Sequence, residues 1–310
     1  MKKVEIYILS GFLGSGKTTL LQQLLKQEKE KKRRIAVVMN ELGQVSIDSN
    51  AIPGDTPLKE LLNGCVCCTI QGQLETQIHS MLQEYELDAI YIETTGVAHP
   101  VEVLDACMSP LFAAQIDMKG IITLVDANRW KDRKQLSIRL QTLLVEQIRH
   151  ADFILINKVD MLTESEQASL LYEIQSLNAN AGCVLTSHAS ISLEAIQGRT
   201  FSLKSSHEKT HVHHHLHLKT FVYEQEKPFD LELFEDWLRR MPDTIYRMKG
   251  YLTFTHSNDL YMFQYSYGMP IYMKEVMKLP TILVLIGENL NHQQIQEQLK
   301  QLEEQSADLS

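Results

Sequence analysis

The sequence predicts a doubly wound α/β domain with a mostly parallel sheet, followed by a smaller α+β domain. Over residues 1–200, short Val/Ile/Leu runs alternate with longer helix-like stretches, as a parallel sheet covered on both faces requires. This alternation then stops, and a polar stretch precedes a second group of strand-like and helix-like segments. We therefore expect a first domain at 1–200, a linker at 201–217 and a second domain at 218–310.

The first domain is expected to alternate strands with helices. Its strand-like runs lie at 4–9, 35–39, 89–92, 121–125, 153–156 and 184–186. Thr56 followed by Pro57 predicts a helix start, because proline is favoured in the first helical turn. Thr163 and Glu166 predict a capping box at another helix start. Residues 69–85 have helical character.

The second domain mixes strands with two helices. Strands are expected at 218–222, 251–255, 261–267 and 282–286, with helices at 231–240 and from about His292. The polar tail at 303–310 is expected to be frayed.

Composition excludes several classes of function. The net charge of -9 gives no electrostatic support for nucleic-acid binding, and the basic run at 29–34 is expected to be the solvated end of a helix. The sequence shows no signal peptide and no apolar run of about 18 residues, so we expect a cytoplasmic protein without a membrane span. Five cysteines, three of them within four positions, favour metal binding in a reducing compartment over disulfides.

A phosphate-binding loop follows the first predicted strand. Residues 11–18 match the pattern G-x-x-x-x-G-K-[ST], with a strand before it and a helix after it. Its glycines let backbone N–H groups face phosphates, Lys17 would reach the β- and γ-phosphates, and the Thr18 hydroxyl would bind Mg²⁺. The expected phosphate-site residues are Gly11, Gly14, Ser15, Gly16, Lys17, Thr18 and Thr19.

A guanine-recognition motif follows the strand at 153–156. Asn157, Lys158 and Asp160 form the pattern N-K-x-D. The Asp160 carboxylate can accept hydrogen bonds from the ring N–H and the exocyclic amine of guanine, whereas adenine would leave this buried carboxylate unpaired. Lys158 can lie along the base, and Asn157 can hold the loop. GTP is therefore the expected nucleotide.

Three cysteines close together predict a metal site. Cys65, Cys67 and Cys68 supply soft thiolate ligands that suit Zn²⁺, Co²⁺ or Cu⁺, and the following helix start would favour the thiolate form. Because Cys67 and Cys68 are adjacent, an open site completed by residues elsewhere is expected. Cys107 and Cys183 stand alone and are expected to be core residues.

These motifs together resemble the CobW-like GTPases, relatives of the urease and hydrogenase nickel chaperones. The resemblance covers nearly the whole chain, in the family's order. The matching segments are S-G-F-L-G-S-G-K-T-T at 10–19, N-E-L-G at 40–43, N-G-C-V-C-C at 63–68, I-E-T-T-G at 92–96, N-K-V-D at 157–160 and Y-R-M-K-G at 246–250.

The resemblance implies a metal-handling P-loop GTPase with a CobW-type C-terminal domain. It implies that Glu41 binds metal with Cys67 and Cys68, with Cys65 a further or alternative ligand. It also implies that Glu93 supports the Mg²⁺ site and that Asp48 positions the attacking water. The expected catalytic set is therefore Lys17, Thr18, Glu93 and Asp48. The sequence departs from the family at Gln44, where an acid is frequent, and at Thr95, where serine is frequent.

A histidine tract occupies the predicted linker. Such a tract suits a weak, multi-site metal buffer, although a solvated linker without a metal role explains it too. Its members are His207, His211, His213, His214, His215 and His217. His99 lies near the predicted nucleotide site, where a lone loop histidine is more often structural.

Three functions compete at this stage. The first is a GTP-dependent metallochaperone that delivers zinc, or cobalt, to a client metalloprotein. The second is a non-catalytic zinc store, and the third is an ATP-using small-molecule kinase, which N-K-x-D argues against. A cobalt-handling GTPase of cobalamin biosynthesis or metalloenzyme activation is a variant of the first. The sequence leaves the oligomeric state open, and a homo-oligomer is one option.

Overall fold

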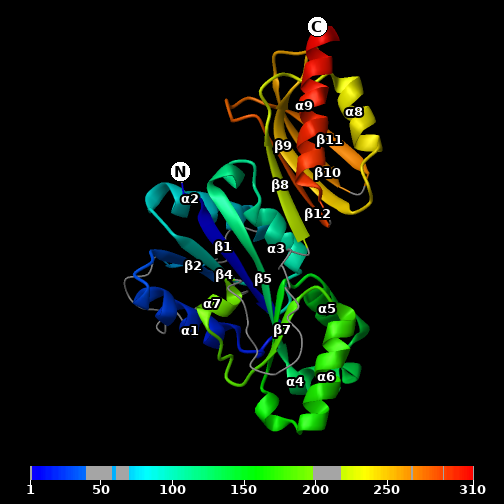
Figure 1. Ribbon diagram of the computed structural model, residues 1–310. Helices are drawn as coiled ribbons and strands as arrows, with labels where there is room; N and C mark the ends of the chain where they lie inside the picture. Colours follow the sequence, from blue (N-terminus) through cyan, green and yellow to red (C-terminus); the bar gives the residue numbers. More distant parts are fainter. Residues whose placement is uncertain are drawn as a thin grey trace. The chain divides into compact units, whose positions relative to one another are not determined.

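The computed structural model describes residues 2–39, 58–60, 70–197, 218–266, 268–288 and 290–309. The chain divides into two compact units. The first consists of Met1–Ala106 and Ile116–His217, and the second of Cys107–Gln115 and Leu218–Ser310. Each unit has its own sheet (Figure 1). Each also has its own hydrophobic core.

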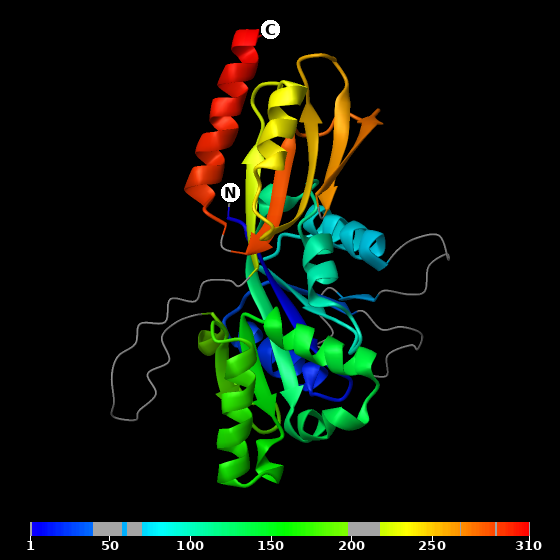
Figure 2. The same cartoon turned by 90° about the vertical axis from the view of Figure 1, so that its right-hand side faces the viewer.

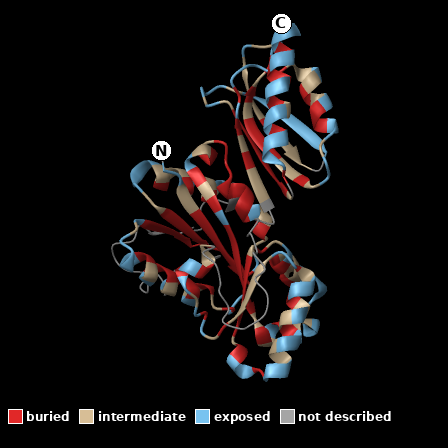
Figure 3. Cartoon of the chain, in the orientation of Figure 1, coloured by how far each residue is buried: buried red, intermediate tan, exposed pale blue. Residues whose placement is uncertain are grey.

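The first unit is built on a seven-stranded sheet in the order β3-β2-β4-β1-β5-β6-β7, with parallel pairing throughout. Its strands are β1 (Val4–Gly11), β2 (Ile35–Met39), β3 (Leu58–Glu60), β4 (Ala89–Glu93), β5 (Ile116–Asp126), β6 (Phe153–Asn157) and β7 (Gly182–Leu185). The central strands β1, β4 and β6 are almost continuously buried, as the apolar runs predict (Figure 3). The expected doubly wound class is confirmed.

Helices cover both faces of this sheet. One core cluster joins the sheet to leucines of α1 and to Leu193 of α7, and another joins it to Leu144 and Ile148 of α5 and to Leu170 and Ile174 of α6. The helices are α1 (Lys17–Glu30), α2 (Ile70–Glu84), α3 (Pro100–Cys107), α4 (Ala127–Lys131), α5 (Ile138–Arg149), α6 (Glu164–Leu177) and α7 (Leu193–Ile196). The capping box of Thr163 and Glu166 is present at the start of α6.

One local expectation for this unit was wrong. The helix expected to start at Thr56 and Pro57 is absent at the described residues that follow, because Leu58–Glu60 form strand β3 and pair with β2. Pairing at the sheet edge overrides the local start signal there. The basic run is exposed at the end of a helix, as expected, except at Arg33. α1 ends at Glu30, and Arg33 beyond it pairs with the fully buried Glu28 and with Glu5.

The second unit is an antiparallel sheet with helices on one face (Figure 2). The strand order is β11-β10-β9-β12-β8. Its elements are β8 (Leu218–Glu224), α8 (Leu231–Arg239), β9 (Ile245–Thr253), β10 (Leu260–Ser266), β11 (Met269–Glu275), β12 (Ile282–Glu288) and α9 (His292–Leu309). Aromatic side chains of α8, among them Phe234 and Trp237, pack with Leu299 of α9 against the strands. The predicted separate α+β fold is confirmed.

The structure differs from the expected second unit at strand β11 and at the C-terminal tail. β11 escaped prediction because it is an exposed edge strand with no buried alternation. The tail is helical to Leu309 and not frayed: Glu303 accepts a hydrogen bond from the Glu226 N–H (2.8 Å) and Ser306 from the Asp230 N–H (2.7 Å). Among the described residues, no helix is both long and apolar enough to cross a bilayer.

Candidate nucleotide site

The phosphate loop connects the end of β1 to the start of α1. Gly16 caps α1 with φ 108°, a left-handed conformation that favours glycine. A Cβ atom on Gly16 would also lie 2.6 Å from Asn157 Nδ2. The loop therefore requires glycine at this position, both for its backbone angle and for its contact with the motif after β6.

Lys17 and Thr18 place a cation and a hydroxyl at the start of α1. Lys17 is only 7% exposed, and its Nζ donates to the carbonyl oxygens of Gly11 (2.8 Å) and Phe12 (3.2 Å). The Thr18 hydroxyl donates to Glu93 Oε1 at 2.7 Å. This threonine hydroxyl and this carboxylate are hard oxygen ligands in contact, and their chemistry fits Mg²⁺. Ser15 is fully buried in the loop, whereas Gly14 and Thr19 are exposed.

The loop after β4 lies against the phosphate loop. Thr94 donates to the Leu9 carbonyl from its N–H (3.0 Å) and from its hydroxyl (3.1 Å). A Cβ atom on Gly96 would lie 2.3 Å from the Leu13 nitrogen, so the two backbones meet at this glycine. The loop that begins at Glu93 therefore packs directly against the phosphate loop.

Asn157 joins the phosphate loop to the base-side loops. It is 2% exposed; its Nδ2 donates to the Ser15 carbonyl (2.8 Å) and its Oδ1 accepts from the Ala189 N–H (2.9 Å). The loop after β7, which carries Ser187, His188 and Ala189, was missed by the sequence analysis. A polar T-S-H-A stretch directly after the last strand of the sheet was the available signal.

Asp160 and Lys158 form the outer part of the site. A hydrogen bond from Ser187 lowers the pKa of Asp160, which keeps its carboxylate ionised. The Asp160 side chain is exposed, and a turn of 3₁₀ helix at Val159–Met161 holds it at the surface. Lys158 adopts φ 64° and pairs with Asp126 at 2.6 Å.

All of these groups lie at the carboxyl ends of parallel strands, the edge at which open α/β sheets bind ligands. Leu9 of β1 and Met39 of β2 both pair with Glu93 of β4. The chain therefore enters the predicted metal segment beside Glu93, and α2 begins at Ile70, two residues after Cys68. The predicted residues outside the described part of the chain are Glu41, Asp48, Cys65, Cys67, Cys68, His207, His211, His213, His214, His215 and His217.

The two remaining cysteines are described. Cys107 is fully buried, and Cys183 packs partly buried against a core cluster. Burial raises the pKa of the Cys183 thiol to about 12. Such a thiol is protonated at neutral pH and is a poor metal ligand.

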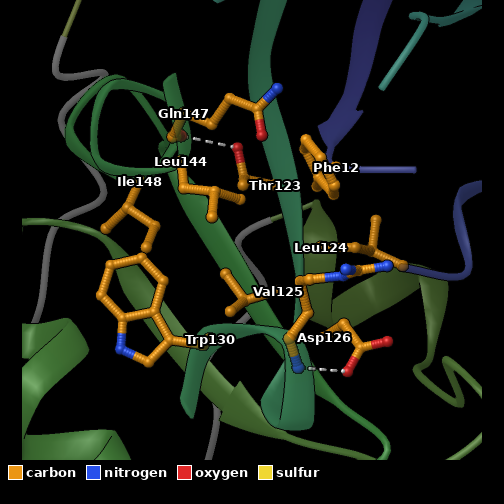
Figure 4. A pocket seen from close by; sticks show the side chains of 10 residues that line it. Phe12, Thr123, Leu124, Val125, Asp126, Trp130, Leu144, Gln147 and Ile148 are labelled. Atoms are coloured by element: carbon orange, nitrogen blue, oxygen red, sulfur yellow. Dashed lines mark hydrogen bonds between the residues drawn. The ribbon is translucent and has the colours of Figure 1, made fainter. Parts of the chain in front are cut away.

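A small, largely apolar pocket lies beside the phosphate loop (Figure 4). Phe12 of the loop faces it, and the Arg129 guanidinium lies 5.6 Å from the centre of the Phe12 ring. Its lining residues are Phe12, Thr123, Leu124, Val125, Asp126, Arg129, Trp130, Leu144, Gln147 and Ile148. The pocket thus places the phosphate loop beside α5, which supplies Leu144, Gln147 and Ile148.

The fold and site define a P-loop nucleotide-binding protein with a guanine-type motif. The model of the CobW/HypB/UreG nucleotide-binding domain matches residues 5–184, and that of the cobalamin synthesis protein cobW C-terminal domain matches residues 218–303. The chain belongs to the CobW/HypB/UreG family, with a CobW C-terminal domain.

Its relatives include proteins named as zinc chaperones. The zinc chaperone YjiA of Escherichia coli is 30% identical over 85% of this chain and 86% of its own length. The zinc chaperone CobW of Sinorhizobium sp is 28% identical over 80% of this chain and 81% of its own. A crystal structure of a Zn(II)-bound triple mutant of the YjiA GTPase covers 97% of this chain and 99% of that one, with a TM-score of 0.50 and 24% identity. This last likeness shows the fold.

Proposed function

We propose that the protein is a GTP-hydrolysing metallochaperone that binds zinc and delivers it to a client metalloprotein. The observation that carries the GTP-binding half is the position of Asn157. It holds the phosphate loop through the Ser15 carbonyl and the base-side loop through the Ala189 N–H. A nucleotide that spans these two loops would contact a phosphate cradle at one end and Asp160 at the other.

The chain's own residues would divide the work at the phosphates. Lys17 would exchange its contacts with the Gly11 and Phe12 carbonyls for the β- and γ-phosphates. Thr18 and Glu93 would hold Mg²⁺, which supplies charge neutralisation to the phosphates when bound. Asp48 is proposed to position the attacking water.

The zinc-binding half of the proposal rests on the cysteine motif and on the family. Cys67 and Cys68, with Glu41 and with Cys65 as a further or alternative ligand, are proposed as the tight site for the zinc cargo. YjiA and CobW are named zinc chaperones, which supports zinc over cobalt. Clustered free thiols suit a reducing compartment, and we propose that the protein works in the cytoplasm.

The sheet topology suggests how the two halves communicate. The segment that contains Glu41 and the cysteines begins at the end of β2, beside Glu93, and ends where α2 begins. We propose that GTP and Mg²⁺ order this segment and complete the metal site, and that hydrolysis releases the metal.

Phosphate release from GTP and ATP, with and without one equivalent of zinc, tests this function. The proposal expects turnover of GTP, much slower turnover of ATP, and a change in GTP turnover with zinc. Zinc binding without any GTP turnover would instead favour a zinc store. Equal use of ATP and GTP would refute guanine recognition by Asp160.

A further inference from the structure

Three metal-ligating side chains meet where the loop after β4 faces the end of α5. His99 directly precedes α3, and Glu146 and His150 lie four residues apart at the C-terminal end of α5. One ligand atom from each of the three lies within 4.8 Å of the other two. His150 Nε2 is 3.1 Å from Glu146 Oε2, and the two imidazole rings are 5.7 Å apart between centres.

We propose that His99, Glu146 and His150 form a second zinc site, separate from the cysteine motif. Two imidazoles and one carboxylate are a donor set that Zn²⁺ favours, and three protein ligands leave a fourth position for water or another ligand. The site therefore suits exchangeable zinc more than a closed structural ion.

The geometry requires only small side-chain movements. Tetrahedral zinc with bonds of about 2.0–2.2 Å needs ligand atoms about 3.3–3.5 Å apart, and the present separations do not exceed 4.8 Å. The side chains of His150 and Glu146 are 13% and 25% exposed, so they are shielded yet reachable from solvent. His99 Nδ1 accepts a long hydrogen bond from the Val101 N–H (3.3 Å), and metal binding through either ring nitrogen would give up this contact, because Nδ1 would then be either the ligand atom or the protonated nitrogen.

The surroundings hold both α5 ligands in place. Arg149 contacts the second carboxylate oxygen of Glu146 at 3.1 Å, which leaves Oε2 for the metal. Asn178 donates to the carbonyls of Ile148, Arg149 and Ala151, which fixes the end of α5. A cation at this helix end also suits the negative end of the helix dipole.

A zinc ion at this position would tie the loop that begins at Glu93 to α5. Gln147, between the two α5 ligands, already contacts this loop through the carbonyls of Gly96 (3.3 Å) and Ala98 (3.4 Å). On its other side, its backbone carbonyl accepts from the Thr123 hydroxyl at 2.9 Å (Figure 4). The metal would add a third connection between α5 and the loop after β4, beside the two hydrogen bonds of Gln147.

The test removes the cysteine and tract-histidine ligands from the full chain. Cys65, Cys67 and Cys68 are changed to serine and the six tract histidines to asparagine, and Co²⁺ and Zn²⁺ are titrated into the resulting protein. We expect one equivalent of Co²⁺ with tetrahedral visible bands and without thiolate charge-transfer absorption. Adding His99→Asn and His150→Asn should remove this equivalent, and Glu146→Gln should weaken it by about tenfold or more.

His256→Asn is the matched control, because His256 is an exposed histidine of the second unit. It should leave the cobalt spectrum and stoichiometry unchanged. If the double variant misfolds, diethylpyrocarbonate labelling of the unmodified chain decides: zinc should protect His99 and His150 but not His256. Unchanged stoichiometry in a folded double variant, or no protection of His99 and His150, would overturn the proposal. Neither result depends on GTP hydrolysis, so the metallochaperone proposal can fail independently.

Discussion

The phosphate end and the base end of the candidate site are built differently. At the phosphate end, Lys17 and Ser15 are buried, and Gly16 packs against Asn157. At the base end, Asp160 and His188 are exposed, and the contacts of Asp160 and Lys158 are to neighbouring side chains on the same rim.

This difference separates two kinds of contribution. A buried, sterically closed phosphate loop contributes most of the binding free energy, because each lost contact leaves a desolvated group behind. The exposed base end contributes selectivity between bases, and losing one of its contacts costs less binding free energy because water can replace it. We therefore expect large effects on binding and turnover from the phosphate end, and smaller, base-dependent effects from the other end.

The largest effect is expected at Lys17. Lys17→Ala removes the cation that the loop offers to the β- and γ-phosphates, so GTP hydrolysis should fall by about 100-fold or more. Phosphate release at saturating GTP measures this. Near-normal turnover would show that the phosphates bind elsewhere.

A smaller effect is expected at Asn157, where the two ends meet. Asn157→Ala should leave the Ser15 carbonyl and the Ala189 N–H without a partner, at about 1–3 kcal/mol each. Unfolding by urea and GTP affinity should both report the loss.

Asn178→Ala is the control for Asn157→Ala. Asn178 is similarly buried and its side chain also bonds several backbone groups, but it follows α6 and its bonds are to the end of α5, away from the nucleotide motifs. It should destabilise the fold and leave the preference for GTP over ATP unchanged. Equal effects of the two variants on nucleotide affinity would mean that Asn157 only stabilises the fold.

Asp160→Asn should lower the selectivity for GTP over ATP more than it lowers nucleotide affinity in general. The carboxylate offers two acceptors to guanine, and the amide can offer only one, so GTP affinity should fall by about 10- to 100-fold. ATP affinity should change little. A parallel loss for both nucleotides would place Asp160 in the support of the site and not in base recognition.

The smallest effect is expected from the histidine tract. Replacement of residues 207–217 by a polar linker of equal length should lower the number of metal ions bound. The tightest site should remain, because thiolates hold zinc more strongly than scattered imidazoles. Loss of that site would show that the tract, and not the cysteine motif, supplies the main ligands.

The sequence predicted the fold class well because its buried strands are nearly continuous apolar runs. It failed where long-range pairing decides the outcome. Leu58–Glu60 became strand β3 by pairing with β2, and β11 is an exposed edge strand whose sequence carries no alternation. The polar end of α9 remains helical because Glu303 and Ser306 bond backbone groups of the loop before α8.

The candidate site was predictable wherever its residues lie close together in a sequence motif of fixed spacing. The contact of Thr18 with Glu93 joins residues 75 positions apart, and only the family resemblance indicates it from the sequence. The loop of Ser187 to Ala189 has no spacing signal of its own, and in the metal-ligating cluster only Glu146 and His150 have one, because they lie four residues apart on a helix. The loop reaches Asn157 only because β7 pairs with β6, and His99 meets Glu146 and His150 only because α5 lies beside the loop after β4.

The coupling of metal binding to the nucleotide is the central claim, and cobalt affinity tests it most directly. Co²⁺ is titrated into the protein with a GTP analogue and Mg²⁺, with GDP and Mg²⁺, and without nucleotide, and the thiolate charge-transfer absorption reports the cysteine motif. The account predicts binding about 5- to 150-fold tighter with the GTP analogue than with GDP, and an equal gain in nucleotide affinity when metal is bound. Cys67→Ala and Cys68→Ala should each remove the signal, and Glu41→Ala should weaken it. Identical cobalt affinity in all three states would contradict the account and favour a zinc store.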